Sequence, residues 1–127
     1  MIQRFKMQDY CIDVDYGGHV VERLKTRFDN LGTGYLDFVL ETIFSDENVA
    51  DYLINDVRIG EDVVVIDEDS GISFAMNVGL ECFFVKTIFN AYEGTMMIGE
   101  MQKVLRYARE LGLRVEEFSR RKVPSYA

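Results

Sequence analysis

Three short segments in the middle of the chain limit the possible folds most strongly. They are Asp62–Asp67, Ile72–Val78 and Leu80–Phe89, and they are rich in valine, isoleucine and phenylalanine. Asp69-Ser70-Gly71 and Gly79 separate them, and residues of these types favour tight turns. We therefore predict a meander of three antiparallel strands. The third segment is apolar on both faces, so we expect it at the centre of the sheet.

The segments before this meander have other periodicities. Tyr10–Asp15 alternates apolar and polar residues and ends at a glycine pair, which predicts a strand. His19–Phe28 repeats apolar residues every four positions, which predicts a helix. Thr33 is the expected N-cap of a second helix, and residues 46–55 are expected to continue as a short helical turn. The predicted buried face of the second helix consists of Leu36, Val39, Leu40 and Ile43.

The C-terminal quarter of the chain has apolar residues at helical spacing. Met101, Val104, Leu105 and Ala108 predict a last helix from residue 99 or 100 to Leu111, which Gly112 ends. Residues 119–127 contain three consecutive bases and are predicted to form a mobile basic tail. Residues 1–127 thus predict a single α+β domain, with an antiparallel sheet of about four strands and helices packed mainly on one face.

The net charge of −8 is distributed unevenly along the chain. Residues 28–85 hold thirteen acids and one base, whereas residues 103–127 hold seven bases and three acids. Nucleic-acid binders usually carry a basic surface, because phosphate contacts dominate their affinity. The acidic middle of the chain favours a negative surface that binds a basic partner or mimics nucleic acid, or one that serves solubility alone. The two ends could still form a basic surface on this acidic body.

No targeting or metal-binding pattern is visible in the sequence. The N-terminus lacks an apolar leader segment, and the longest apolar runs are too short to span a bilayer. Cys11 and Cys82 lie in apolar runs and are predicted to be two buried thiols of a cytoplasmic protein. The acids Asp67-Glu68-Asp69 could bind a divalent cation, but their spacing differs from a calcium loop and a solvated hairpin tip is the alternative. We expect no metal, no cofactor and no membrane partner.

A row of cations lies on the first predicted helix. His19, Arg23 and Arg27 are four residues apart, so their side chains lie on one face of the helix beside its apolar stripe. Two interpretations stay open: a solvated basic face, or a cationic row at a cleft between helix and sheet.

Lys86 interrupts an otherwise apolar strand. A buried ammonium is costly without a partner, so Lys86 must pair with an acid, reach solvent or line a cleft. Tyr92 follows this strand and could present its hydroxyl beside Lys86, or it could simply pack.

Together these residues resemble the RelE/colicin-type family of small RNA-cleaving toxins. The helix motif His19-x-x-x-Arg23-x-x-x-Arg27 and the late strand Val85-Lys86-Thr87-Ile88-Phe89 carry the resemblance, which covers roughly residues 10–92. The resemblance implies metal-independent RNA cleavage, in which a ribose 2′-OH attacks the adjacent phosphate. It implies His19, Arg23 and Lys86 as catalytic residues, and Arg27 and Tyr92 as substrate-binding residues. Histidine titrates near neutral pH, and arginine and lysine stabilise developing negative charge.

Two functional hypotheses follow from these patterns. The first is a toxin-like endoribonuclease that binds RNA, whose protein partner would be an antitoxin. The second is a non-catalytic acidic interaction protein, encoded by a phage or mobile element, that binds a host protein or mimics nucleic acid.

Overall fold

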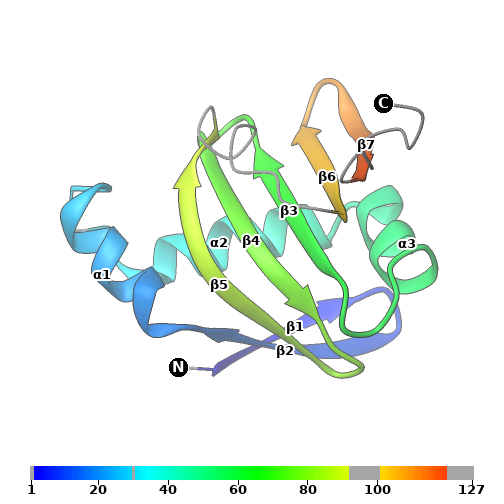
Figure 1. Cartoon of the computed structure of the whole chain (residues 1–127), viewed down its shortest axis with the longest axis horizontal. Helices are drawn as coiled ribbons and strands as arrows, with labels where there is room; N and C mark the ends of the chain where they lie inside the picture. The colour runs from blue at the N-terminus through cyan, green and yellow to red at the C-terminus, as the bar shows by residue number, and fades with distance from the viewer. Residues whose placement is uncertain (1, 30, 92–100, 120–127) are drawn as a thin grey trace, which may run out of the picture.

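The computed structural model describes residues 2–29, 31–91 and 101–119, which form seven strands and three helices (Figure 1). All seven strands belong to one sheet, in the order β1-β2-β5-β4-β3-β6-β7. Helix α2 crosses behind the central strands, α1 lies beside β5, and α3 lies near the β6–β7 end of the sheet. In chain order the elements are β1 (Ile2–Met7), β2 (Tyr10–Tyr16), α1 (Gly18–Thr26), α2 (Thr33–Phe44), α3 (Glu47–Asn55), β3 (Asp62–Asp67), β4 (Ile72–Val78), β5 (Cys82–Asn90), β6 (Met101–Ala108) and β7 (Gly112–Ser119).

The predicted α+β class is correct, but the predicted sheet is wrong. Strands β3, β4 and β5 do form the expected antiparallel meander. The sheet is nevertheless mixed rather than antiparallel, because β2 runs parallel to β5 and β3 runs parallel to β6. It also has seven strands instead of about four. Both parallel pairs join segments that are far apart in the sequence, and local periodicity carries no information about such partners.

The helix predicted over residues 99–111 is wrong where the structure describes that segment. Met101–Ala108 is strand β6, which pairs with β3 on one side and with β7 on the other. Leu105 and Tyr107 enter the main core, whereas Val104 is buried on the opposite face of the sheet. A strand buried on both faces has no alternating pattern, so its apolar residues matched helical spacing. Gly112 has a positive φ of 73°, which a hairpin turn can use as well as a helix end.

The three helices lie close to their predicted positions. The N-cap of α2 is Gly32, so Thr33 is the first helical residue and not the cap. Helix α3 begins after Asp46, whose carboxylate accepts hydrogen bonds from the backbone N–H groups of Asn48 and Val49. The hydroxyl of Tyr52 donates to Glu117 at 2.9 Å and thereby ties α3 to β7.

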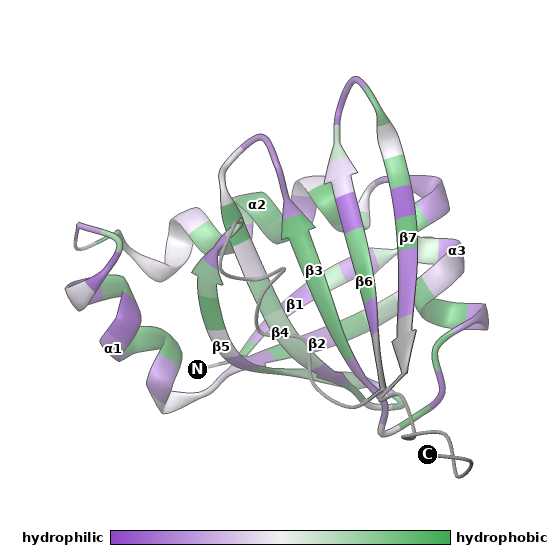
Figure 2. Ribbon diagram, turned by 45° about the horizontal axis from the view of Figure 1, so that its top comes forward, coloured by the Kyte–Doolittle hydropathy of each residue, from purple (hydrophilic) through white to green (hydrophobic). Residues whose placement is uncertain are grey.

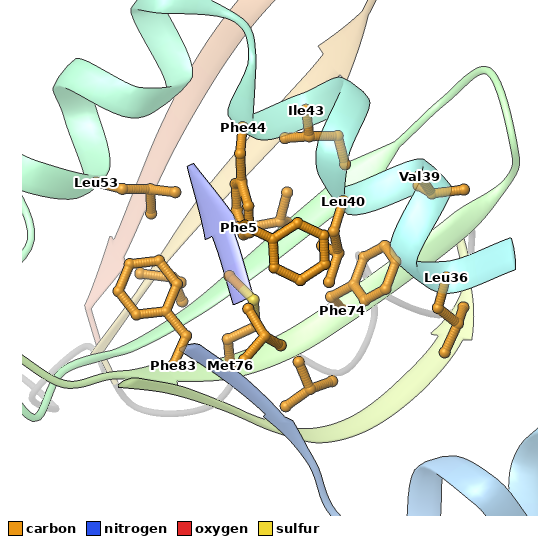
Figure 3. Close-up of a cluster of buried hydrophobic side chains, with 14 of the residues drawn as sticks. Phe5, Leu36, Val39, Leu40, Ile43, Phe44, Leu53, Phe74, Met76 and Phe83 are labelled. Carbon is orange, nitrogen blue, oxygen red and sulfur yellow. The ribbon is translucent and has the colours of Figure 1, made fainter. Parts of the chain in front are cut away.

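Side chains from all three helices and from one face of the sheet form the main core. Figure 3 shows the part of this core around α2. Phe44 of α2 lies at its centre, with edge-to-face contacts to Phe5 at 5.6 Å and Phe83 at 5.9 Å between ring centroids. Strand β3 is hydrophobic along most of its length (Figure 2). Its alternate residues Val64 and Ile66 form a smaller buried cluster with Val104 on the outer face of the sheet, which is the face opposite the main core.

The end of β2 positions helix α1. Pairing between β2 and β5 stops at Tyr16 and Val85, so β5 continues beyond its neighbour and α1 packs beside the extension. Gly17 makes the connection, and its N–H donates to the Val85 carbonyl at 2.9 Å. A Cβ at this position would lie 2.9 Å from the tip of the Phe84 ring and 3.2 Å from the Val85 carbonyl oxygen, so a larger residue would displace the exposed Phe84 side chain.

Candidate functional site

The cations of α1 lie at the end of the molecule where the helix meets β5. His19 is highly exposed, and its Nδ1 lies 3.9 Å from the Glu22 carboxylate. The guanidinium of Arg23 lies over the Phe89 ring of β5, 5.1 Å from the ring centroid. The Nη1 atom of Arg23 is buried and has no hydrogen-bond partner in the described part of the chain. Arg27 is the exposed C-cap residue of α1.

Lys86 belongs to an ion pair on the outer face of the sheet. Its Nζ lies 2.9 Å from the carboxylate of Asp62. Lys86 lies at an irregularity in the pairing of β5 with β4, since its neighbours Val85 and Thr87 pair with consecutive β4 residues. Asn77 donates a second hydrogen bond to the same carboxylate. Burial acts to raise the pKa of Asp62, but the hydrogen bonds from Asn77 and Lys86 outweigh it, so the pKa is lowered overall. Of the three predicted alternatives for Lys86, the structure shows the one in which it pairs with an acid.

The proposed catalytic set is brought together only in part. Arg23 contacts the strand that carries Lys86, as the helix–sheet cleft hypothesis requires. His19, however, approaches Glu22, and Lys86 approaches Asp62. Tyr92 and the tail from residue 120 onward lie outside the described residues. Catalysis by this set stays a prediction.

The acids at the β3–β4 turn are occupied by local contacts. Asp67 accepts from the Ser70 N–H, Asp69 accepts from the Arg109 N–H, and Glu68 pairs with Arg114. Burial raises the pKa of Asp67. Within the described ranges, no cluster of three or more histidine, cysteine or acidic side chains is placed to hold a metal ion. Asp69 and Glu68 therefore join the meander to the β6–β7 hairpin, whereas Asp67 holds its own turn.

Other cations of the sheet also form ion pairs with acids of this chain. Arg4 pairs with Asp13 across the β1–β2 hairpin, and its hydrogen bond and charge lower the pKa of Asp13. Arg106 pairs with Glu116 across the β6–β7 hairpin. On the face of the sheet that carries the main core, Lys103 lies 3.3 Å from Glu61. Cations of the sheet are thus largely neutralised by acids of this same chain.

Helices α2 and α3 are different, because they carry acids and no lysine or arginine. Residues 28–57 contain seven acids and no base. Four exposed acids, which lie on α2, on α3 or at the C-cap of α3, form no ion pair with any part of the chain that the structure describes: Glu41, Glu47, Asp51 and Asp56. We refer to these four residues as the acidic helical layer. Two aromatic residues of α2, Tyr35 and Phe38, are also exposed, and they precede Glu41 on the same helix.

An apolar pocket of about 230 Å³ lies at the end of the molecule formed by the β1–β2 turn, the α3–β3 loop and the β4–β5 turn. Sequence reasoning missed this pocket. The available signal was the presence of Ile59 and Leu80 within turns, each flanked by glycine and a charged residue. The lining residues are Met7, Tyr10, Ile12, Leu53, Ile54, Val57, Ile59, Val78, Gly79, Leu80 and Phe83.

The cysteines are not the buried pair that the sequence predicted. Cys11 and Cys82 are free and both are exposed. They occupy the ends of neighbouring strands, where apolar neighbours in the sequence point into the core and the cysteines do not.

No family model, no curated protein and no solved structure matches this chain. None of the described helices is long and apolar enough to cross a membrane.

Proposed function

We propose that this protein is a non-catalytic interaction protein that binds a basic region of a partner protein through its acidic helical layer. The observation that carries the proposal is the contrast in charge pairing within one molecule. Arg4, Lys86 and Arg106 each have an acidic partner on the sheet, whereas Glu47 and Asp51 have no cationic partner among the described residues.

The physical argument concerns what unpaired surface acids can do. A field of one sign attracts an oppositely charged partner over several ångströms and raises the rate of encounter. Aromatic side chains supply apolar contact area once the partner has arrived, and Tyr35 and Phe38 are exposed on the helix that carries Glu41. An acidic surface with exposed aromatics therefore suits a basic protein surface.

The test is affinity capture from lysate, with identification of the captured protein. The variant Glu47→Gln/Asp51→Asn removes two charges from the layer. Its matched control, Asp29→Asn/Glu110→Gln, removes two exposed charges elsewhere and leaves the same net charge. We expect the first variant to lose most of the captured basic partner and the control to retain it. Capture that is unchanged at high salt contradicts the proposal, because salt screens contacts between exposed charges.

The endoribonuclease remains a second candidate, and one observation favours it. Arg23 has a buried nitrogen that finds no hydrogen-bond partner among the described residues, and it lies on the same helix as the exposed His19. An unsatisfied guanidinium nitrogen can bind a phosphate oxygen. In this proposal His19 acts as acid or base, Arg23 and Lys86 stabilise the phosphorane, and Arg27 and Tyr92 hold the RNA. Lys86 would have to leave Asp62 in order to take part.

This second candidate is tested with purified protein and total RNA. We expect cleavage by the wild type and none by His19→Ala/Arg23→Ala. Cleavage by both proteins, or by neither, excludes catalysis at this position.

A further inference from the structure

The apolar pocket has a rim of exposed hydrophobic side chains. Three residues of its lining have large exposed fractions: Tyr10 with 53%, Ile59 with 67% and Leu80 with 73%. Ile59 and Leu80 lie in two turns, and Tyr10 is the first residue of β2, directly after a third turn; the three turns meet at this end of the molecule. Contiguous apolar surface of this kind on a charged protein commonly marks a binding site.

Backbone hydrogen bonds hold the rim in place. The Gly60 N–H donates to the Val78 carbonyl at 2.6 Å, and the Asn77 side chain donates to the Gly60 carbonyl at 2.8 Å. In the neighbouring turn, the Gly79 N–H donates to the Cys82 carbonyl at 2.9 Å. A Cβ on Gly79 would lie 2.4 Å from that carbonyl oxygen, so this turn requires glycine. The pocket is therefore formed before any ligand arrives, which reduces the entropy lost on binding.

The charges around the pocket are mainly negative. The three turns carry the exposed acids Asp9, Asp56 and Glu81, and none of them belongs to an ion pair within residues 2–29, 31–91 and 101–119. Arg58 is the exposed cation among them, and Glu61 in the same loop is bound to Lys103. An apolar cavity inside an acidic rim complements an apolar group that carries positive charge beside it.

We propose that this pocket receives a large apolar side chain of the basic partner, from a segment in which arginine or lysine flanks that side chain. The proposal rests on the proposed function and names the anchor of the same interaction. Asp56 belongs to both surfaces, because it is in the acidic helical layer and lies next to the pocket residue Val57. A buried anchor surrounded by charge pairs is the usual arrangement of a binding hot spot.

A peptide with a central tryptophan flanked by arginines is the probe. The protein contains no tryptophan, so fluorescence from the peptide reports its own environment. We expect saturable binding with a shift of the emission to shorter wavelength, because the indole leaves water. A peptide with glutamates in place of the arginines is expected to give no shift.

Matched variants locate the contact. Ile59→Ser is expected to weaken binding about tenfold or more, as truncation of a hot-spot residue does. Leu111→Ser is the control, because Leu111 is also 67% exposed and lies in the β6–β7 turn at another part of the sheet. Equal losses in the two variants, or a full shift with the glutamate peptide, overturn the proposal. Self-association of the wild type that Ile59→Ser abolishes also overturns it, since a second copy would then be the occupant.

A third peptide separates the two proposals. It keeps the arginines and has serine in place of tryptophan, and its binding is measured by calorimetry at low and high salt. If this peptide binds in a salt-dependent way while the tryptophan peptide shows no shift, the pocket proposal fails and the acidic interaction stands. If none of the arginine peptides binds, both proposals fail.

Discussion

The outer face of the sheet and the acidic helical layer differ in whether their charged side chains form ion pairs within the described residues. On the sheet, Arg4 pairs with Asp13, Lys86 with Asp62 and Arg106 with Glu116. In the helical layer, Glu47 and Asp51 lie one turn apart on α3 with no cation on either helix. Like charges at this spacing destabilise a helix slightly. Ion pairing within the chain therefore accounts for these charges of the sheet, but it does not account for Glu47 and Asp51.

Backbone geometry explains part of this contrast. A strand places each side chain opposite residues of two neighbouring strands, so charges from distant parts of the sequence can pair. An exposed helix face offers partners mainly three or four residues away. The contrast yields a functional argument only because α2 and α3 contain no lysine or arginine at any position.

The largest change in the free energy of unfolding is expected for a residue that joins α2 to the sheet. Phe44 is 1% exposed and connects α2 to β1 and β5 through its ring contacts with Phe5 and Phe83. Phe44→Ala should lower the free energy of unfolding by about 3–5 kcal/mol, since it removes apolar contact and leaves a cavity. Denaturant unfolding followed by circular dichroism measures this change.

Phe38→Ala on the same helix is the control, because Phe38 is 56% exposed. Its cost should be well under that of Phe44→Ala. Similar costs for the two variants would mean that the helical layer is not held to the sheet through Phe44.

Much of the fold could be predicted, but only from segments whose pattern is local. Strands β3 and β4 have the predicted bounds, and the bounds of the helices differ from the prediction by a few residues. These elements could be predicted because turn residues and local periodicity define them. Strand β6 could not be recognised, because its two buried faces give the same apolar spacing as a helix. The parallel pairs were also invisible, since each depends on a partner far along the chain.

The candidate sites show the same limit. The sequence indicated that Lys86 needs a partner, a cleft or solvent, but nothing in it identified Asp62, which lies twenty-four positions earlier. The pocket required three turns to meet, and its residues Tyr10, Ile59 and Leu80 are separated by 49 and 21 positions. Charge asymmetry was visible from the start, whereas the distinction between paired and unpaired charges needed coordinates.

The next effect concerns the polar link between the two regions. The hydroxyl of Tyr16, at the end of β2, donates to Asp37 of α2 at 2.6 Å. Tyr16→Phe should cost about 1–2 kcal/mol, because a part-buried carboxylate loses a charge-assisted hydrogen bond. Thermal unfolding of the two proteins at neutral pH measures the loss.

The alkaline pH dependence of the same pair supplies a second measurement. Burial, followed by the bond to Asp37, raises the pKa of Tyr16 above its ordinary value of 10.0. The associated stability is full below that ordinary value and is lost as the pH rises toward the raised one. Tyr16→Phe should flatten this alkaline loss, and an unchanged profile would contradict the assignment.

A smaller effect is expected for the Lys86–Asp62 pair on the sheet. Both side chains are partly exposed, at 47% and 39%, so solvent screens their interaction. Asp62→Asn should cost about 0.5–1 kcal/mol at neutral pH. Because the folded-state pKa of Asp62 is lowered, its contribution is present above the ordinary value of 3.8 and is lost as the pH falls through the lowered one. The difference between wild type and variant should therefore shrink in acid, and a difference that grows there would show that the pair is not the cause.

The smallest effect has the opposite sign and is the sharpest test of the contrast between sheet and helices. Asp51 is exposed and lies one helical turn after Glu47, and its carboxylate accepts from Asn55, which an asparagine at this position can also do through its carbonyl. Asp51→Asn relieves the repulsion, so it should raise the free energy of unfolding by about 0.2–0.5 kcal/mol at low salt. The gain should fade as salt increases, because screening already weakens the repulsion in the wild type. If Asp51→Asn instead destabilises the protein as much as Asp62→Asn does, the helical acids serve folding like those of the sheet, and their availability for a partner would have no support from charge pairing.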